Sequence, residues 1–426
     1  MNSKNGFTKD FWLVVIGQII SLFGNGVVRF ALPLHLLGVT GSAALLGLVS
    51  GCAFLPLAFM TPLGGLIADR VNKRNIMVIL DFFTAALVVL FLVLYGKVNL
   101  VGLILVMLFL LYGISGAYQP SVQASIPMLV SEDRIMSGNA AINMVSSLSG
   151  LLGPALGGIA YSAWGILPVL KVCAGCFFAS AVMEIFIHIP IVKRERKTSL
   201  LKEAGEDLKE SIVFIVKKNP AVGRLTICSA CINFFLSALI IIGMPVVVMQ
   251  TLAFDSQKAS LLYGLMQALL AAGGLAGGLF AGVFASRLKM DFVWKSLFLC
   301  AFLLIPMGVA LMLPLSPYVA FVMIAAAGMA SMAIASICSI QIMSYIQLTT
   351  PSHLIGKVIA WMIALSTCAQ PAGQIVYGFL FETFADTVGW LFAGAAVFSL
   401  GVACYSRKVV DQLPEVDRAV TAAVYS

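Results

Sequence analysis

The chain has 426 residues, of which 61% are hydrophobic and only 10% are charged. Soluble domains carry about 25% charged residues, so this composition excludes a protein whose surface mainly faces water. The formal net charge of +8 would suit a nucleic-acid partner. The positions of the basic residues, described below, instead favour a membrane protein with no nucleic-acid partner.

Twelve apolar segments follow one another along the chain, and each is long enough to cross a bilayer. A helix needs about 20 residues to span a hydrocarbon core of roughly 30 Å, and it satisfies its own backbone hydrogen bonds inside lipid. We therefore predict an all-α membrane protein with twelve transmembrane helices. The predicted spans are 11–37, 43–67, 75–95, 98–120, 138–162, 166–190, 224–249, 259–285, 292–314, 317–345, 355–380 and 388–406.

The basic residues predict the orientation, because cytoplasmic loops are enriched in Lys and Arg. With the N-terminus inside the cell, only four of the 26 Lys and Arg residues fall outside the cytoplasmic segments. These four are Arg29, Lys97, Lys171 and Lys258. We expect a multi-pass membrane protein with both termini in the cytoplasm.

A polar stretch divides the twelve spans into two sets of six. Residues 192–223 alternate acidic and basic side chains at helical spacing, which predicts a cytoplasmic linker helix. The expected parts are therefore a six-helix half at 1–191, this linker, a second half at 224–406 and a cytoplasmic tail at 407–426.

Two short sequence matches relate the predicted halves. GGLIAD begins at Gly64 and GGLFAG at Gly277, while GPALGGIAY begins at Gly153 and QPAGQIVY at Gln370. Because the two matches have nearly equal spacing, they indicate duplication of a six-helix unit. Parallel six-helix repeats are a known architecture of membrane transporters.

Two motifs are rich in small residues. One lies at the end of the second span, and the other lies within the fifth span. The segment after the second span reads GLIADRVNKR from Gly65, a small-residue helix end followed by a basic turn that sets topology. In the fifth span GPALGG contains Gly153, Pro154, Gly157 and Gly158. Glycine allows close helix contact, and proline removes a backbone hydrogen bond.

Both motifs resemble those of the major facilitator superfamily. GLIADRVNKR is similar to its cytoplasmic loop signature, although Asn72 and Lys73 stand where the family usually has Gly and Arg. GPALGG resembles the fifth-helix motif of its antiporters. Longer stretches such as DRVNKRNIMVILD and QPSVQASIPMLV resemble the bacterial branch of macrolide-efflux and enterobactin-exporter proteins.

The resemblance implies a fold of two pseudo-symmetric six-helix halves in a bacterial inner membrane. It also implies a conformational latch on the inner side, with Asp69 acting near the start of the eleventh span. The residues of this expected latch are Gly65, Asp69, Arg70, Lys73 and Arg74.

Few polar side chains lie within the spans, and these are the candidates for contact with substrate or a coupling ion. A charge at mid-bilayer costs about 2.5–3.5 kcal/mol on insertion scales. Arg29 is therefore expected either to bind an anionic group through its forked guanidinium or to extend to the outer surface. Asp81 is a candidate coupling group that could instead pair with Arg70 or Arg74. The remaining candidates are the amides Asn25, Gln119, Asn143 and Gln370.

The leading interpretation is a secondary transporter that exports a hydrophobic or amphipathic small molecule, such as a drug, macrolide or siderophore, by alternating access. The resemblance implies proton-coupled antiport, although the fourth span lacks the arginine that proton-coupled drug exporters of the family often carry. Import of a metabolite and flipping of a lysolipid remain alternatives within the same fold.

An enzyme is the interpretation from another class, namely a membrane-embedded transferase. It would need clustered His, Asp or Glu residues, and the three histidines are scattered. Two CxxC pairs, at Cys173 and Cys228, have no nearby His or carboxylate to complete a metal site. We therefore assign no catalytic residue, cofactor or metal. The expected partners of a monomeric protein are a small-molecule substrate, protons and membrane lipid.

Overall fold

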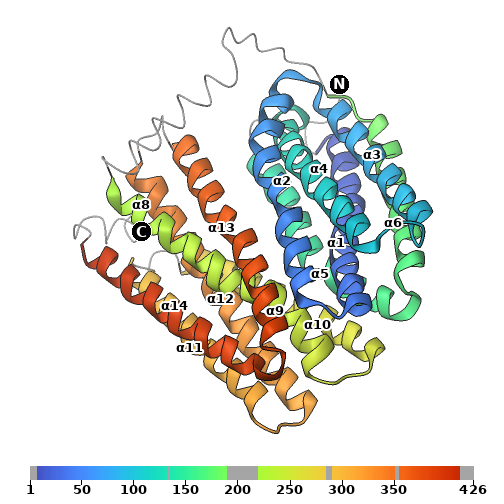
Figure 1. The fold of residues 1–426 in the computed structure, drawn as a ribbon. Helices are drawn as coiled ribbons and strands as arrows, with labels where there is room; N and C mark the ends of the chain where they lie inside the picture. The colour runs from blue at the N-terminus through green and yellow to red at the C-terminus, as the bar shows by residue number, and fades with distance from the viewer. Residues whose placement is uncertain (1–6, 132–134, 190–218, 285–289, 351–354, 413–426) are drawn as a thin grey trace. The chain divides into compact units, whose positions relative to one another are not determined.

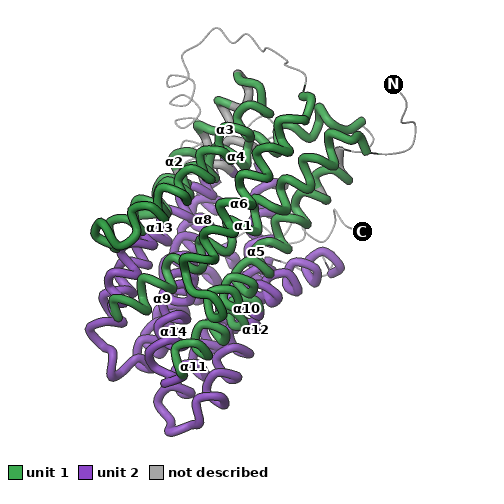
Figure 2. Tube along the Cα trace, turned by 90° about the vertical axis from the view of Figure 1, so that its right-hand side faces the viewer, with its two compact units in different colours: residues 1–41, 52–197, 255–268 green, residues 42–51, 198–254, 269–426 purple. Residues whose placement is uncertain are grey.

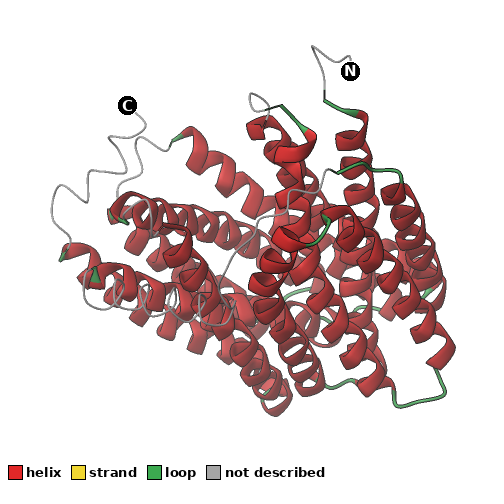
Figure 3. Ribbon diagram, turned by 90° about the horizontal axis from the view of Figure 1, so that it is seen from above, coloured by secondary structure: helices red, strands yellow, loops and turns green. Residues whose placement is uncertain are grey.

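The computed structural model describes residues 7–131, 135–189, 219–284, 290–350 and 355–412. Within these ranges the chain forms twelve long helical segments and no strand (Figures 1 and 3). The first six are α1 (Lys9–Thr40), α2 (Ala43–Arg70), α3 (Lys73–Leu94), α4 (Leu100–Leu129), α5 (Ile135–Trp164) and α6 (Ile166–Ile185). The last five are α10 (Ser256–Val283), α11 (Asp291–Met312), α12 (Pro317–Thr349), α13 (Ile355–Thr383) and α14 (Val388–Asp411), the last preceded by the short turn η6 (Ala385–Thr387).

The seventh segment is a continuous helix that contains two wider turns. It comprises α8 (Pro220–Ile232), the π-helical turn η3 (Asn233–Ser237), α9 (Ala238–Val246) and a second π-helical turn, η4 (Val247–Thr251). Pro245 lies two residues before η4 and has no amide hydrogen to donate. The wider turn therefore begins beside the residue that interrupts the regular hydrogen-bond ladder.

Apolar side chains cover the outside of these helices. Phe59 is 68% exposed, Val283 75% and Trp390 67%. Among the described residues, eleven helices are long and apolar enough to cross a membrane, and α13 is the predicted span that falls outside this set. An all-helical protein with this surface is stable only where lipid covers the apolar side chains.

Polar residues in the loops set where the helices begin and end. Thr8 Oγ1 accepts a hydrogen bond of 3.1 Å from the Phe11 amide and caps α1. Asn72 Oδ1 accepts a hydrogen bond of 3.0 Å from the Arg74 amide and caps α3, at the position where the family signature has Gly. Gly41 ends α1 with a φ of 65°, a left-handed conformation that glycine adopts without a steric penalty.

Three helices end five or more residues away from the ends of the predicted spans. α4 does not end near Pro120 but continues to Leu129. A proline inside a membrane helix is tolerated where side chains form hydrogen bonds with the backbone. Here the Ser121 hydroxyl donates to the Ala117 carbonyl at 3.0 Å. α6 ends at Ile185, five residues before the predicted end. α14 continues to Asp411, into the predicted tail, whereas most of the predicted linker helix lies outside the described residues.

The helices form two compact units (Figure 2). Unit 1 contains residues 1–41, 52–197 and 255–268; unit 2 contains residues 42–51, 198–254 and 269–426. The units thus differ from the predicted halves in two places, because the first turns of α2 join unit 2 and the first turns of α10 join unit 1. The division of the chain into halves at 1–191 and 224–406 stays a prediction.

The same helix pairs make contact in each set of six. In unit 1, α1 packs on α4, α5 and α6, while α3 packs on α4 and α6. In unit 2, α8 packs on α12, α13 and α14, while α11 packs on α12 and α14. Each contact of the first set therefore has its counterpart in the second, as duplication of a six-helix unit predicts.

The matched glycines of the repeat each allow two helices to cross at short distance, one crossing in each unit. A Cβ atom at Gly64 of α2 would lie 2.5 Å from the Ala117 Cα of α4. A Cβ atom at Gly277 of α10 would lie 2.0 Å from the carbonyl oxygen of Ala333 on α12. Both distances are shorter than any side chain could occupy, so glycine is needed at both positions for the close crossing of these helices.

Candidate functional site

Arg29 lies where α1 meets α4. Its Nη2 atom donates to the Leu111 carbonyl oxygen at 2.8 Å and also to the Ser115 hydroxyl. Its guanidinium carbon lies 4.1 Å from the centre of the Tyr112 ring. One turn of α4 thus supplies a carbonyl, a hydroxyl and an aromatic face, so Arg29 is held within the helix bundle and does not extend freely to the surface.

The charge of Arg29 is incompletely balanced. No ion pair joins it to a carboxylate in the described part of the chain. Its Nε atom is buried and has no hydrogen-bond partner among the residues that the structure describes. An arginine remains charged in proteins and presents five donors in one plane. A guanidinium with a spare donor and no acidic partner can bind an anionic group of a ligand.

Aromatic and amide side chains from two more helices of unit 1 surround this turn. The Phe54 ring of α2 lies 5.4 Å from the Tyr112 ring. The Tyr263 ring of α10 stacks on Phe30, one residue after Arg29, at 4.9 Å. Gln267 donates to the Tyr263 hydroxyl at 2.7 Å. The result is a cation set among aromatic rings, an arrangement suited to an amphipathic ligand.

Sequence reasoning identified Arg29 but not the residues around it. Tyr112 and Ser115 lie in the fourth span, and their spacing of three residues places them on one helix face. Tyr263 and Gln267 have the same relation, at a spacing of four. An aromatic residue followed by a polar one on the same face is the signal that would have indicated them.

The predicted amides are not gathered around Arg29. Asn25 donates to the Ser21 carbonyl of its own helix at 3.1 Å. Asn143 is exposed on α5, while Gln119 of α4 and Gln370 of α13 are half-buried. Their proposed contact with substrate stays a prediction.

Asp81 does not pair with Arg74. Its side chain is 2% exposed, and its Oδ1 atom accepts a hydrogen bond of 2.9 Å from the Ser21 hydroxyl of α1. Arg74 Nη2 donates instead to the Ile185 carbonyl at the end of α6. The end of α6 offers free carbonyl oxygens within reach of Arg74, and this leaves Asp81 without a cation among the described residues.

The expected latch is described only in part. Gly65, Asp69 and Arg70 lie on the last turns of α2, and their side chains are outside the described set. Lys73 is buried at the first turn of α3, and Arg74 joins that turn to α6 within unit 1. The latch role of these residues stays a prediction.

The fifth-helix motif packs on two neighbours at once. Gly153 lies against Gly26 of α1, where its Cβ atom would be 3.1 Å from the Gly26 Cα. Gly158 lies against Gly264 of α10, where a Cβ atom would be 2.8 Å from the Gly264 Cα. Gly157 packs on Phe30 and Pro154 bends the same stretch. The motif thus places α5 tightly between α1 and α10.

The contact between α5 and α10 ends in a polar pair. The Ser162 hydroxyl donates to the Gln257 carbonyl at 2.9 Å, and Gln257 Nε2 donates to the Ser162 carbonyl at 3.3 Å. In unit 2 the corresponding contact joins α13 to α2, where Gly378 meets Gly47 and Glu382 accepts from the Ser42 hydroxyl and from the Ala44 amide. Both contacts link a helix of the first predicted half to one of the second.

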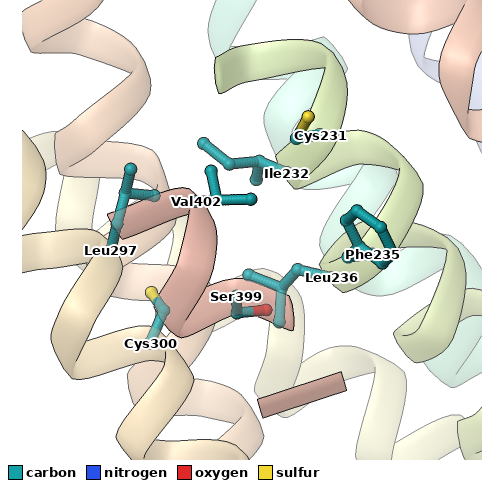
Figure 4. Close-up of a pocket in the computed structure, with 8 residues that line it drawn as sticks. All are labelled: Cys231, Ile232, Phe235, Leu236, Leu297, Cys300, Ser399 and Val402. Carbon is teal, nitrogen blue, oxygen red and sulfur yellow. The ribbon is translucent and has the colours of Figure 1, made fainter. Parts of the chain in front are cut away.

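A separate crevice in unit 2 is apolar (Figure 4). It lies among α8, η3, α11 and α14, and the described residues that line it carry no charge. Its lining residues are Cys231, Ile232, Phe235, Leu236, Leu297, Cys300, Ser399 and Val402. Among the described residues that line it, one hydroxyl and two thiols are the polar groups, so this crevice offers little to orient a polar substrate.

Comparisons with known proteins agree with this architecture. The family model of the Major Facilitator Superfamily matches residues 14–373. Macrolide efflux protein A of Streptococcus pyogenes is 24% identical over 95% of this chain and 97% of its own length. The multidrug efflux pump Tap of Mycobacterium tuberculosis is 25% identical over 99% of this chain and 98% of its own length.

Solved structures of similar fold include two transporters. The nucleoside transporter NupG has a TM-score of 0.72 at 14% identity, over 96% of this chain and 100% of that one. A bacterial homologue of the human lysosomal transporter Spinster has a TM-score of 0.68 at 16% identity, over 99% and 97%. At identities of 14% and 16%, the solved structures show that the fold is shared. The match to the family model shows that this chain is related to the superfamily in sequence. The chain belongs to the major facilitator superfamily.

Proposed function

We propose that this protein exports amphipathic small molecules across a bacterial inner membrane by alternating access, driven by protons. The observation that carries the proposal is the similarity over nearly the whole chain to two efflux pumps, one named for macrolides and the other for multiple drugs. A shared role in efflux explains that similarity better than a shared substrate does.

Membership of the superfamily establishes the coarser part of this function. The protein is a multi-pass secondary transporter of small molecules and not an enzyme, as the sequence predicted. Its curated relatives are bacterial. We propose in addition that transport is outward, that protons drive it and that both termini lie in the cytoplasm.

The surroundings of Arg29 support a substrate class. Aromatic rings from α1, α2, α4 and α10 offer apolar contact, and the guanidinium offers one unused donor. The preferred substrate is therefore a molecule with an apolar body and one anionic group. Import, the opposite direction of transport, is an outcome that the following test separates from export.

The function is tested by accumulation in cells that lack their own drug pumps. Cells with and without the protein receive an acidic fluorescent dye, a neutral dye or a macrolide, before and after an ionophore collapses the proton gradient. Lower accumulation that the ionophore reverses supports proton-driven export. Higher accumulation in expressing cells indicates import and contradicts the proposal, as does unchanged accumulation of every compound in the panel.

The latch yields a prediction of its own. Asp69→Asn is expected to impair transport while leaving membrane insertion intact, because the substitution removes the charge of the proposed latch without changing side-chain volume. Transport is measured in vesicles, and insertion is measured as the amount of protein in the membrane fraction. Asp386→Asn, which neutralises an exposed acid of η6, is the matched control. Wild-type transport by Asp69→Asn would remove the latch role.

A further inference from the structure

A second polar cluster lies buried in unit 1, about two to three turns of α1 from Arg29. It draws one or two residues from each of four helices: α1, α3, α4 and α6. Its members are Gln18, Ser21, Asp81, Tyr118, Ser180 and Glu184, each less than 5% exposed. Two of them are carboxylic acids, Asp81 and Glu184, and the function described above does not use Glu184.

The hydrogen bonds of the cluster form two short chains. Gln18 Nε2 donates to the Tyr118 hydroxyl at 2.9 Å, and Tyr118 donates to Glu184 Oε1 at 2.5 Å. The Ser21 hydroxyl donates to Asp81 Oδ1 at 2.9 Å. Both chains begin on α1, three residues apart, and both end on an acid of another helix.

The second oxygen of each acid is left without a donor. Asp81 Oδ2 and Glu184 Oε2 are buried and have no hydrogen-bond partner among the described residues. Because Gln18 and Ser21 lie on one face of α1, the two hydrogen-bond chains direct both acids to the same buried site. Two ionised carboxylates in one buried site repel each other, and an unpaired buried charge is unfavourable, so at least one acid must hold a proton in this conformation.

The charged groups on the surrounding helices do not neutralise the pair. On α3, Lys73 and Arg74 precede Asp81 by about two turns, and Arg74 donates to the Ile185 carbonyl. On α1, Asp10 accepts from the His188 amide. No ion pair reaches Asp81 or Glu184 in the described ranges. The other charged or titratable groups of these helices lie elsewhere along them: Lys9, Arg29, His35, Tyr112, Lys171, Cys173 and Cys176.

We propose that Asp81 and Glu184, linked through Tyr118 and Ser21 to α1, form the proton-binding site of this transporter. A proton from water adds to one free carboxylate oxygen, giving a neutral carboxyl group, and it returns to water when the site next becomes accessible. This inference rests on the proposed proton-driven export and names the residues that would carry the proton.

The same two helices connect the proton site to the proposed substrate site. Gln18 and Tyr118 join α1 to α4, and so do Arg29 and Ser115. The two contacts on α1 are eleven residues apart, about 16 Å along the helix. A shift of α1 against α4 when a substrate binds Arg29 therefore also changes the donors of the acid pair. Coupling between two sites requires such a shared element.

The test uses purified full-length protein in liposomes with two measurements. The first is uphill transport driven by a pH gradient, and the second is exchange of labelled for unlabelled substrate without a gradient. Asp81→Asn and Glu184→Gln are expected to abolish gradient-driven accumulation while exchange continues, because exchange needs no net proton movement. Asp386→Asn, which removes an exposed acid, is expected to retain both activities.

The outcomes separate this inference from the proposed function. Gradient-driven accumulation retained by both neutral variants and by their double variant would overturn the proton site alone. A wild-type protein that shows exchange but no response to a pH gradient would overturn proton coupling and the site together. If the variants do not fold, Ser21→Ala and Tyr118→Phe keep the test open. Each should change the infrared band of the protonated carboxyl group in the wild-type background, and an unchanged band in both would overturn the site.

Discussion

Arg29→Ala is expected to weaken binding of acidic substrates by about ten-fold to a hundred-fold, with a much smaller effect on neutral ones. Hydrogen bonds to charged groups contribute about 1.5–3 kcal/mol, and 1.4 kcal/mol corresponds to a ten-fold change in affinity. The guanidinium has a buried Nε donor without a partner in the described part of the chain, so an anionic ligand gains a bond that a neutral ligand cannot match. Binding is measured by competition between an acidic and a neutral dye of similar apolar size.

Two variants distinguish a substrate contact from a structural one. Arg29 also joins α1 to α4 through Leu111 and Ser115, so its loss will lower stability. Arg29→Lys keeps the charge but loses the planar fork, and it should retain part of the preference for acidic ligands. Lys171→Ala removes an exposed cation on α6 and should leave the preference unchanged. Equal weakening of acidic and neutral ligands by Arg29→Ala would contradict the proposed contact.

The sequence predicted the helices because a helix that crosses lipid appears in the sequence as one continuous apolar segment. A span must be apolar over about 20 residues whatever surrounds it, and the twelve predicted spans match the twelve long helices. The paired strings at Gly64 and Gly277 were also informative, since a helix crossing that close allows only glycine. Helix ends were less well predicted: α4 passes through Pro120 because Ser121 bonds the backbone locally.

The polar clusters could not be predicted because they depend on lateral neighbours. Glu184 and Asp81 are 103 residues apart in sequence, and only the packing of α3 on α6 brings them together. Asp81 was expected to pair with Arg70 or Arg74, a reasonable expectation from residues within three turns. The structure instead brings Ser21 from α1, since the face of α3 that carries Asp81 is turned towards the bundle interior.

A disulfide between α5 and α10 is expected to abolish transport. Ser162 and Gln257 exchange two hydrogen bonds, one from each residue, which brings their backbones close enough for a cysteine pair to react. Under alternating access this contact, and its counterpart between α13 and α2, must separate for the substrate to leave on that side. In the variant Ser162→Cys/Gln257→Cys, oxidation should stop substrate export and a reductant should restore it.

The position of the pair allows the cross-link itself to be measured. In the sequence, residue 162 precedes the 192–218 segment and residue 257 follows it. Cleavage at a protease site introduced into this segment therefore gives two pieces that the disulfide joins covalently. Each single cysteine variant controls for the nine native cysteines and should transport normally after oxidation. Because Gly158 and Gly264 hold the same helices in contact one turn away, the link adds little strain to this conformation. Undiminished export by fully cross-linked protein would show that α5 and α10 stay together throughout the cycle, and the outward path would then have to open elsewhere.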